Sequence, residues 1–500
     1  MKYSARLLAA SALIAAPLLT TAKTMPLTEA SLEGDERIQT PIGEITLEHN
    51  YITDDMSQAL FDELDYQRAV QLYIWSTPLV SFYQWMNEQV KVYGGGEPHE
   101  FTVFESLKEK RGIVTANLTT PYILSWGSLA DGPIYVELPV GQTAGGALDM
   151  WQRPITDFGL TGPDQCKGGR FIIVGPEDDI KKYLDDSDKS LHVFQSETNN
   201  LFFGIRLLDD SPEFAKTFKK NFKLGSSWKK MKSAKFIEGK NKEWSATAPR
   251  GIEYWKVLHQ AINAEPVRTI DKPWMAMLKP LGIEKGESFK PNERQLGILK
   301  QGVMMGELML RNLQTNPRFV EPYWAKTSWY KSFDFDIPQE NDIMQQLDER
   351  GVWFYEAVTS TKGMVNPTEG KGQVYMTSKR DSEGRLLRAD KTYKLTVPAN
   401  VPVKQFWALT LYSENTRRPY DNGGKDVRSA NLSSKDEGLQ VNKDGSVDLY
   451  IGAKAPKGME SNFVKTVDQD GWFVYFRLYG PLKAFFDKSW GLPDFEEVTI

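Results

Sequence analysis

Apolar residues recur at every third or fourth position along Ser57 to Tyr93, the spacing of one face of an α-helix. Pro78 lacks the N–H that an inner helical turn uses, so it predicts a break between two helices. The second helix runs from Leu79 towards Tyr93 and ends at the glycines 94–96. The apolar face of the first helix consists of Leu60, Phe61, Leu64, Val70, Tyr73 and Ile74.

A further helix is predicted after Pro291, because proline is favoured in a helix's first turn. Met304, Met305 and Met309 lie in this segment, and clustered thioethers can hold a soft metal. No histidine or cysteine is close in the sequence, so we expect these methionines to fill a core. The apolar stripe consists of Leu296, Leu299, Val303, Met304, Leu308 and Leu310.

Short runs rich in β-branched and aromatic residues, bounded by turn residues, predict strands. TPIGEITLEHNYI predicts a short strand pair near residue 45. Five runs follow between residues 121 and 208: PYILSW, PIYVELP, GRFIIVGP, SLHVFQS and NLFFGIRLL. Four runs lie after residue 390: KTYKLTVP, VKQFWALTLY, GSVDLYIG and GWFVYFRLYG. PLKAFFDKSW then predicts a short final helix that starts at Pro481.

A chain of 500 residues exceeds what one hydrophobic core normally supports, so several domains are expected. The patterns predict an α+β fold in three parts. Residues 40–210 form an N-terminal domain of helices and a mixed sheet, and 211–370 form a mainly helical region. Residues 371–500 form an antiparallel β-sandwich, jelly-roll-like, because the strands are short and evenly spaced.

The N-terminus has the pattern of a secretory signal peptide over residues 1–22. Lys2 and Arg6 precede the apolar run LLAASALIAAPLL, and small residues up to Ala22 offer a cleavage point. The run is shorter than the roughly 20 apolar residues that span a bilayer. We therefore expect a periplasmic or secreted protein without a transmembrane anchor.

The overall charge of the chain argues against nucleic acid as a partner. Lys and Arg number 61 and Asp and Glu 66, for a formal net charge of -5, and nucleic-acid binding needs a basic footprint instead. The stretch from Lys216 to Lys242 holds ten lysines and one acid, Glu238, and is interpreted as a solvated face. One cysteine cannot form an internal disulfide.

Blocks along most of residues 40–500 resemble a bacterial, mostly exported, two-part family of paired domains of unknown function, DUF1254 followed by DUF1214. The N-terminal blocks include NLTTPYILSWGSLADGPIYVELP and TDFGLTGPDQCKGGRFIIVGP. The C-terminal blocks include VKQFWALTLYSENTR and RLYGPLKAFFDKSWGLPDFE. The resemblance implies an α+β N-terminal part, a helical middle and a C-terminal sandwich. It assigns no activity.

The chain departs from the family's pattern at two positions. Ala116 stands where members usually carry proline, before the asparagine of NLTTPY. Cys166 stands where members usually carry glycine. A thiol nucleophile needs a nearby base, and His49, His99, His192 and His259 are all distant in sequence. We therefore interpret Cys166 as a local replacement in a tight loop.

Other motifs point to no standard chemistry. The glycine-rich loop from Gly162 to Gly169 is followed by RFIIV, a strand, whereas a phosphate-binding loop opens a helix. No HExxH, CxxC or GxSxG spacing occurs, and NKDGSVD is interpreted as a hairpin turn rather than a calcium loop. We expect no cofactor and no metal.

Aromatic rings and arginines are the candidate recognition groups. The rings are Tyr122, Trp126, Trp151, Trp407, Tyr412, Tyr479 and Trp490, and the arginines are Arg206, Arg417 and Arg477. Because sites favour domain interfaces, we predict that NLTTPY, the glycine-rich loop and the strand ending in RLY converge on one cleft. The predicted ligand-binding residues are Asn117, Tyr122, Asp164, Lys167, Arg170, Arg477 and Tyr479.

Three function hypotheses stay open. The first is an enzyme acting on a polar small molecule or glycan, a hydrolase or lyase that uses carboxylate, Tyr or Arg groups; its catalytic residues are unknown. The second is a noncatalytic glycan- or small-ligand-binding protein. The third is a cell-envelope scaffold. A homo-oligomer is compatible with each.

Export is directly testable. We expect the mature protein to begin near Lys23, because Ala22 ends the cleavage segment. N-terminal sequencing of protein from the envelope fraction checks this. An intact Met1 on protein from the cytoplasm would contradict it.

Overall fold

The computed structural model describes residues 24–185, 187–209, 211–239, 242–318, 320–333, 335–422, 430–467 and 471–500. The predicted signal peptide, residues 1–22, lies outside them. The chain divides into two compact units, Met1–Gln67 and Arg68–Ile500. Within the described ranges, no helix combines the length and apolar character needed to cross a membrane.

The first unit contains a four-stranded sheet of order β1-β2-β3-β4. Its strands are β1 (Thr24–Pro26), β2 (Glu36–Thr40), β3 (Gly43–Glu48) and β4 (Tyr51–Ile52). β2 and β3 pair antiparallel, and their side chains Ile38, Ile45 and Leu47 are buried. The predicted strand pair is thereby confirmed.

Helix α1 (Asp54–Tyr93) is continuous through Pro78, so the predicted break is wrong. Pro78 has no N–H to donate to the Ile74 carbonyl, and side chains from other segments bind neighbouring carbonyls of the same turns. The Trp75 carbonyl accepts Nη2 of Arg350 at 2.7 Å, and the Pro78 carbonyl accepts Nε2 of Gln152 at 2.7 Å. The helix ends at the predicted glycines, where Gly94 has φ +77°.

Two sheets pack face to face in the N-terminal part of the second unit. One is six-stranded, in the order β15-β5-β6-β12-β8-β9, and the other is five-stranded, in the order β11-β10-β7-β13-β14. One apolar core holds Phe101 and Phe203 from the first sheet with Val136 and Phe171 from the second. The strands are β5 (Glu100–Phe104), β6 (Tyr122–Ser128), β7 (Ile134–Leu138), β8 (Thr143–Asp149), β9 (Pro154–Gly159), β10 (Gly169–Val174), β11 (Leu191–Gln195), β12 (Asn200–Leu207), β13 (Lys223–Gly225), β14 (Met231–Ser233) and β15 (Lys235–Glu238).

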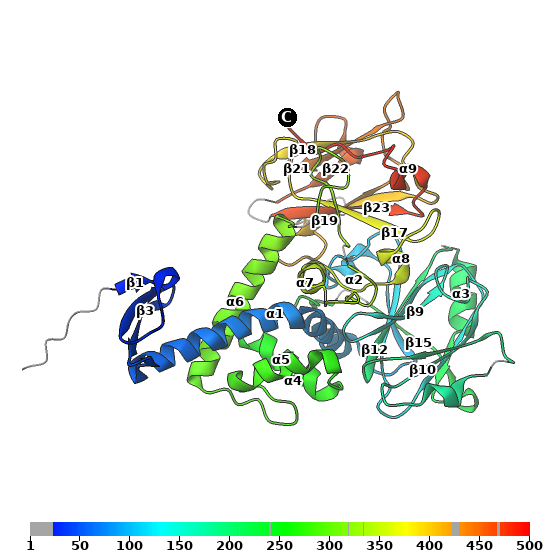
Figure 1. The fold of residues 1–500 in the computed structure, drawn as a ribbon. Helices are drawn as coiled ribbons and strands as arrows, with labels where there is room; N and C mark the ends of the chain where they lie inside the picture. Colours follow the sequence, from blue (N-terminus) through cyan, green and yellow to red (C-terminus); the bar gives the residue numbers. More distant parts are fainter. Residues whose placement is uncertain are drawn as a thin grey trace, which may run out of the picture. The chain divides into compact units, whose positions relative to one another are not determined.

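Helices gather around the second half of α1 (Figure 1). The buried face of α6 contains Gly302, Val303, Gly306 and Leu310, whereas Met304, Met305, Leu308 and Met309 are exposed. The expectation that these methionines fill a core is therefore wrong. The face of α6 that packs on α1 carries glycines instead, and these let the two helices approach closely. The helices are α2 (Leu107–Lys110), α3 (Pro212–Asn221), α4 (Ile252–Ala264), α5 (Lys272–Leu278), α6 (Glu293–Thr315), α7 (Leu347–Glu356), α8 (Lys362–Val365) and α9 (Lys483–Phe486).

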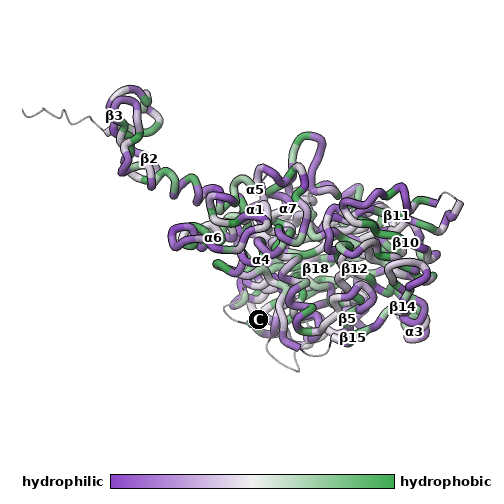
Figure 2. Tube along the Cα trace, turned by 90° about the horizontal axis from the view of Figure 1, so that it is seen from below, coloured by the Kyte–Doolittle hydropathy of each residue, from purple (hydrophilic) through white to green (hydrophobic). Residues whose placement is uncertain are grey.

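The C-terminal part is a sandwich of two sheets, β16-β17-β23-β19-β20 and β22-β21-β18-β24. A shared core joins Leu409 and Phe476 of the first sheet to Leu395 and Leu449 of the second. All pairs are antiparallel except β21 with β22. In Figure 2, which colours the chain by hydropathy, green apolar segments lie among the strands of the N-terminal sheets, for example at β10 and β12. The strands are β16 (Tyr330–Lys331), β17 (Gln373–Ser378), β18 (Thr392–Val397), β19 (Trp407–Ser413), β20 (Asn431–Ser433), β21 (Val447–Gly452), β22 (Phe463–Lys465), β23 (Trp472–Tyr479) and β24 (Glu496–Val498). The predicted α+β fold is confirmed.

The glycines of α6 provide a test with an internal control. A Cβ at Gly302 would lie 2.5 Å from the Cβ of Ala69, whereas a Cβ at Gly297 meets nothing within 4 Å. We expect Gly302→Ala to lower the free energy of unfolding by about 1–3 kcal/mol, the cost of overpacking. Gly297→Ala should raise it by about 1 kcal/mol, the difference in helix propensity. Urea denaturation measures both, and equal effects of the two substitutions would contradict the close α1–α6 contact.

Candidate functional site

A cavity of about 130 Å³ lies where the six-stranded sheet faces the C-terminal sandwich. β6, β8 and β12 form one wall, and β17 and β23 form the other. The segments 113–120 and 358–364 line it between the two walls. The volume is far above the roughly 10–15 Å³ that one water molecule needs. The cavity is therefore large enough for a small organic molecule.

Glycines form the floor on the six-stranded sheet. Gly145 and Gly146 of β8 and Gly204 of β12 line the cavity, and Gly204 pairs with Gly146 across the ladder. A Cβ at Gly204 would lie 2.7 Å from the ring of Phe202, and one at Gly145 would lie 1.9 Å from the Gly204 carbonyl oxygen. Glycine inside a strand marks a place where another group approaches the backbone closely.

Arg477 is the central charged group of the opposite wall. Side chains alternate along β23, so Val474, Phe476 and Leu478 face the sandwich core and Arg477 faces away from it. Its Nη1 donates to Tyr412 Oη at 2.6 Å and to Thr410 Oγ1 at 3.2 Å, and its Nη2 donates to the Thr115 carbonyl at 3.0 Å. Its Nε has no partner, although only 1% of the residue is exposed.

Two more cations belong to the same cavity. Arg206 of β12 lines it, and Lys110 lies behind the lining, where Nζ donates to the Thr120 carbonyl at 2.8 Å. The pKa of Lys110 is lowered to about 8, mainly by burial and to a smaller extent by the nearby Arg206, against the attraction of Glu109 and Glu105. None of the described carboxylates forms an ion pair with Lys110, Arg206 or Arg477.

The described lining contains no acidic side chain, so its charge has one sign. Four tyrosines surround the arginines, and burial raises the pKa of Tyr122, Tyr475 and Tyr479, the last to about 12. These hydroxyls are therefore neutral at physiological pH. The guanidinium carbon of Arg477 lies 4.9 Å from the ring centroid of Tyr375 and 5.2 Å from that of Tyr475. Ring faces are the main electron-rich groups near the charge.

The structure brings three of the seven predicted residues, Tyr122, Arg477 and Tyr479, to this cavity. Tyr122 Oη accepts the Asn117 N–H at 2.8 Å, and Tyr479 stacks on Phe406 with centroids 4.0 Å apart. The NLTTPY block and the end of β23 therefore converge, and these are two of the three segments that the cleft prediction named. Their role in binding stays a prediction.

The other four predicted residues do not line the cavity. Asn117 closes its own turn, where Oδ1 accepts the Thr119 N–H at 2.8 Å. Asp164 accepts the N–H of Gly159 at 2.7 Å, Arg170 pairs with Asp188 at 2.7 Å, and Lys167 is exposed. No residue of the glycine-rich loop, Gly162 to Gly169, lines the cavity, although Leu160 and Thr161 just before it do.

Most of the other candidate recognition groups serve packing. Arg417 is buried and donates Nε to the Tyr355 carbonyl at 3.3 Å. Tyr412 donates to the Ala116 carbonyl at 2.8 Å and thereby docks the NLTTPY loop on the C-terminal sheet. The tryptophans Trp126, Trp151, Trp407 and Trp490 are buried.

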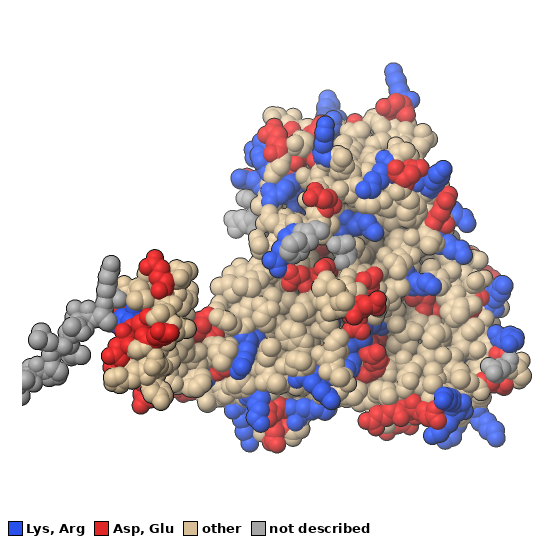
Figure 3. Space-filling view, viewed as in Figure 1, with Lys and Arg blue, Asp and Glu red and all other residues tan. Residues whose placement is uncertain are grey.

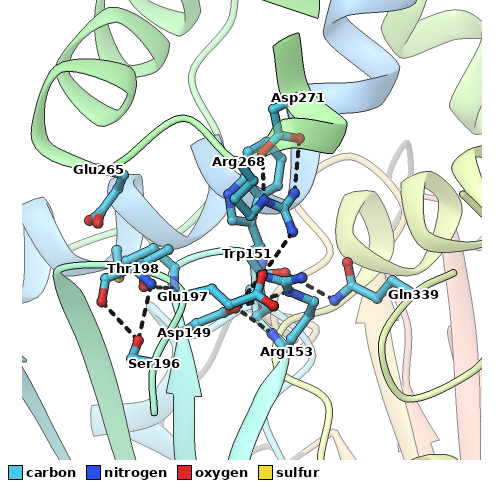
Figure 4. Close-up of polar contacts among 12 residues, drawn as sticks. Asp149, Trp151, Arg153, Ser196, Glu197, Thr198, Glu265, Arg268, Asp271 and Gln339 are labelled. Carbon is cyan, nitrogen blue, oxygen red and sulfur yellow. Dashed lines mark hydrogen bonds and ion pairs between the residues drawn. The ribbon is translucent and has the colours of Figure 1, made fainter. Parts of the chain in front are cut away.

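A larger ionic cluster lies elsewhere and is closed (Figure 4). Arg153 donates to Asp149 and Glu197, and Arg268 donates to both oxygens of Asp271. Trp151 lies between these partners, with the Arg268 guanidinium 4.7 Å from its ring. The adjoining cavity measures only about 10 Å³. Charges of both signs are paired here, so this cluster joins α-helices to the sheet rather than receiving a ligand.

Sequence reasoning missed Lys110 and the three floor glycines. The signal for the glycines was present, since TAGGALD and FFGIR place glycine inside strands. No sequence signal pointed to Lys110, because its burial depends on the tertiary fold. In the described ranges, no three His, Cys, Asp or Glu side chains gather as a metal site.

Two family models match the chain, one over each of the two regions that line the cavity. Residues 98–226 match DUF1254 and residues 372–483 match DUF1214, both described as proteins of unknown function. The chain therefore contains both of these regions, in this order. The wall formed by β6, β8 and β12 comes from the first region, and β17 and β23 come from the second.

A solved structure shares the fold. The VPA0106 protein from Vibrio parahaemolyticus superposes with a TM-score of 0.52 at 17% identity, over 87% of this chain and 100% of that chain. An uncharacterized protein from Burkholderia cenocepacia gives a TM-score of 0.39 at 13% identity, over 89% of this chain and 96% of that chain. No curated protein matches the chain.

Cys166 lies outside the cavity lining and has φ +64°, a conformation that favours glycine. Burial raises the pKa of its thiol, which disfavours a nucleophilic thiolate. We expect Cys166→Gly to leave the free energy of unfolding unchanged or to raise it by up to about 1 kcal/mol. Chemical denaturation checks this. A marked loss of stability would mean that the thiol has a structural role.

Proposed function

We propose that this protein binds a small organic anion, with a carboxylate group and an apolar body, in the cavity between its DUF1254 and DUF1214 regions. The observation that supports the proposal is a cavity lined by two arginines and no acid. Arg477 is buried and retains an N–H on Nε and one on Nη2 without a partner. The corresponding nitrogens of Arg388 hold both oxygens of Asp390. A ligand carboxylate would fit the same fork.

The rest of the lining suits the apolar body of such a ligand. Trp85, Phe202, Trp353, Met364 and Phe406 all line the cavity. Aromatic rings provide flat apolar contacts, and the tyrosine and threonine hydroxyls provide orientation. The glycine floor leaves room next to the backbone of the six-stranded sheet.

A noncatalytic binding role fits this lining better than hydrolysis or lyase chemistry. Acid–base catalysis needs a group that titrates near the working pH within reach of the substrate. The described lining holds no carboxylate, histidine or lysine, and burial raises the pKa values of Tyr122, Tyr475 and Tyr479. We further propose that the protein acts outside the cytoplasm, as its N-terminal pattern suggests.

Replacing Arg206 tests the anion site without disturbing the buried network. Its side chain has no ion-pair partner among the described residues, so Arg206→Met should fold as the parent does. In calorimetric titrations with acetate, hexanoate, benzoate and 4-hydroxybenzoate, we expect the parent to bind at least one acid. Arg206→Met and Arg477→Lys should each weaken that binding by about tenfold to a hundredfold, as charge-assisted hydrogen bonds are worth about 1.5–3 kcal/mol.

Arg388→Met is the matched control, because Arg388 is an exposed arginine on the sandwich that pairs with Asp390. It should leave the affinity unchanged. Equal affinity of all three variants would contradict the proposal.

The affinity should also depend on pH through Lys110. The pKa of its ammonium is about 8 because of burial, so its charge is present below pH 8 and is lost as the pH rises through that value. Loss of one nearby charge should weaken anion binding by roughly three- to tenfold between pH 7 and 9. Calorimetry at several pH values measures this. Lys110→Met should remove the dependence, and a parent affinity that is flat over this range would rule out a role for Lys110.

A further inference from the structure

A second cavity, of about 90 Å³, lies between the C-terminal end of α6, helix α7 and strands β16 and β17. It shares no lining residue with the anion cavity. Its polar lining consists of Gln314, Ser332, Thr377 and Glu356 with the charged residues Arg318, Lys331, Asp348 and Glu349, of which Arg318 and Asp348 form an ion pair. Its apolar lining comes from Leu313, Pro317, Val320, Val352 and the ring of Tyr330.

Buried oxygens without a hydrogen-bond partner concentrate at this cavity. Among the described residues, seven hydroxyl or side-chain amide oxygens are buried and unpartnered, and three of them belong to residues that line this cavity. The three are Oε1 of Gln314, Oγ of Ser332 and Oγ1 of Thr377. Gln314 is only 7% exposed. Native proteins leave few such atoms, because each costs the desolvation of a polar group. Their concentration indicates a polar partner at this place.

The charges at the inner end are already balanced by neighbours. Glu356 accepts hydrogen bonds from Gln314 Nε2 and Tyr475 Oη. Lys379 lies 3.9 Å from Glu356 and 2.6 Å from Glu414. An anionic ligand would meet Glu356, and a cationic one that extends into the neighbouring cavity would meet Lys379. The unpartnered groups are an amide acceptor and two hydroxyls that both donate and accept, which matches the hydroxyl groups of a neutral molecule.

We propose that this cavity binds a small neutral polyhydroxy molecule of the sugar or polyol class. A neighbouring cavity of about 230 Å³ shares Gln314, Pro317, Tyr330 and Thr377 with it and provides room for the remainder of a larger polyol. The ring of Tyr330 borders both and offers the apolar surface on which sugar rings pack. The site is independent of the anion cavity.

The test is calorimetric titration of the mature protein with D-glucose, myo-inositol and glycerol into the millimolar range. We expect saturable binding of at least one. Thr377→Val and Ser332→Ala each remove one unpartnered hydroxyl, so each should weaken binding about fivefold without lowering the stability of the free protein. A structural role for these hydroxyls would predict the opposite pattern, with stability lost.

Thr143→Val is the matched control, because Oγ1 of Thr143 is also buried without a partner but lines neither cavity. It should keep the parent's polyol affinity, as should Arg206→Met. The proposal is overturned if the parent binds none of the three probes saturably. It is also overturned if Thr377→Val and Ser332→Ala both bind as tightly as the parent.

Discussion

The junction between the two family regions depends on one buried positive charge, the guanidinium of Arg477. Its Nη2 donates to the Thr115 carbonyl of the N-terminal region, and Tyr412, which accepts from Nη1, donates to the Ala116 carbonyl. Burying a charge without a counterion costs several kcal/mol, and hydrogen bonds and ring faces offset only part of that cost. A bound carboxylate would supply the missing counterion. The same group therefore connects the two regions and, under the proposed function, also receives the ligand's carboxylate.

The cavity's chemistry differs from that of the surface. Acidic and basic side chains are interspersed over the visible face of the second unit in Figure 3, and the net charge of the chain is -5. The described cavity lining carries two arginines and no acid. Bulk charge therefore contains no information about this site. Tyr475 connects the two proposed sites, because it lines the anion cavity and its hydroxyl donates to Glu356 at the second cavity. The pKa of Glu356, which burial raises to about 7, places that carboxylate's titration in the physiological range.

Local pattern predicted much of the fold and part of the site. Alternation along β23 places Tyr475, Arg477 and Tyr479 on one face, and the argument that sites favour domain interfaces placed Tyr122 beside them. Continuity of α1 through Pro78 could not be predicted, because the donors that bind its carbonyls, Arg350 and Gln152, come from distant segments. Likewise, the local turn bonds of Asp164 and the exposure of Lys167 remove that loop from the site, and neither is visible in the residue types alone.

The most direct test of the account compares a carboxylic acid with its primary amide, benzoate with benzamide for example, in titrations of the unmodified protein. The two ligands have the same shape and differ in charge. If Arg477 and Arg206 recognise an anion, the acid that binds best should bind at least about tenfold more tightly than its amide, and the difference should shrink at high salt. Equal affinity of acid and amide, or no binding of any small acid, would contradict the claim that the junction of the two regions is an anion site.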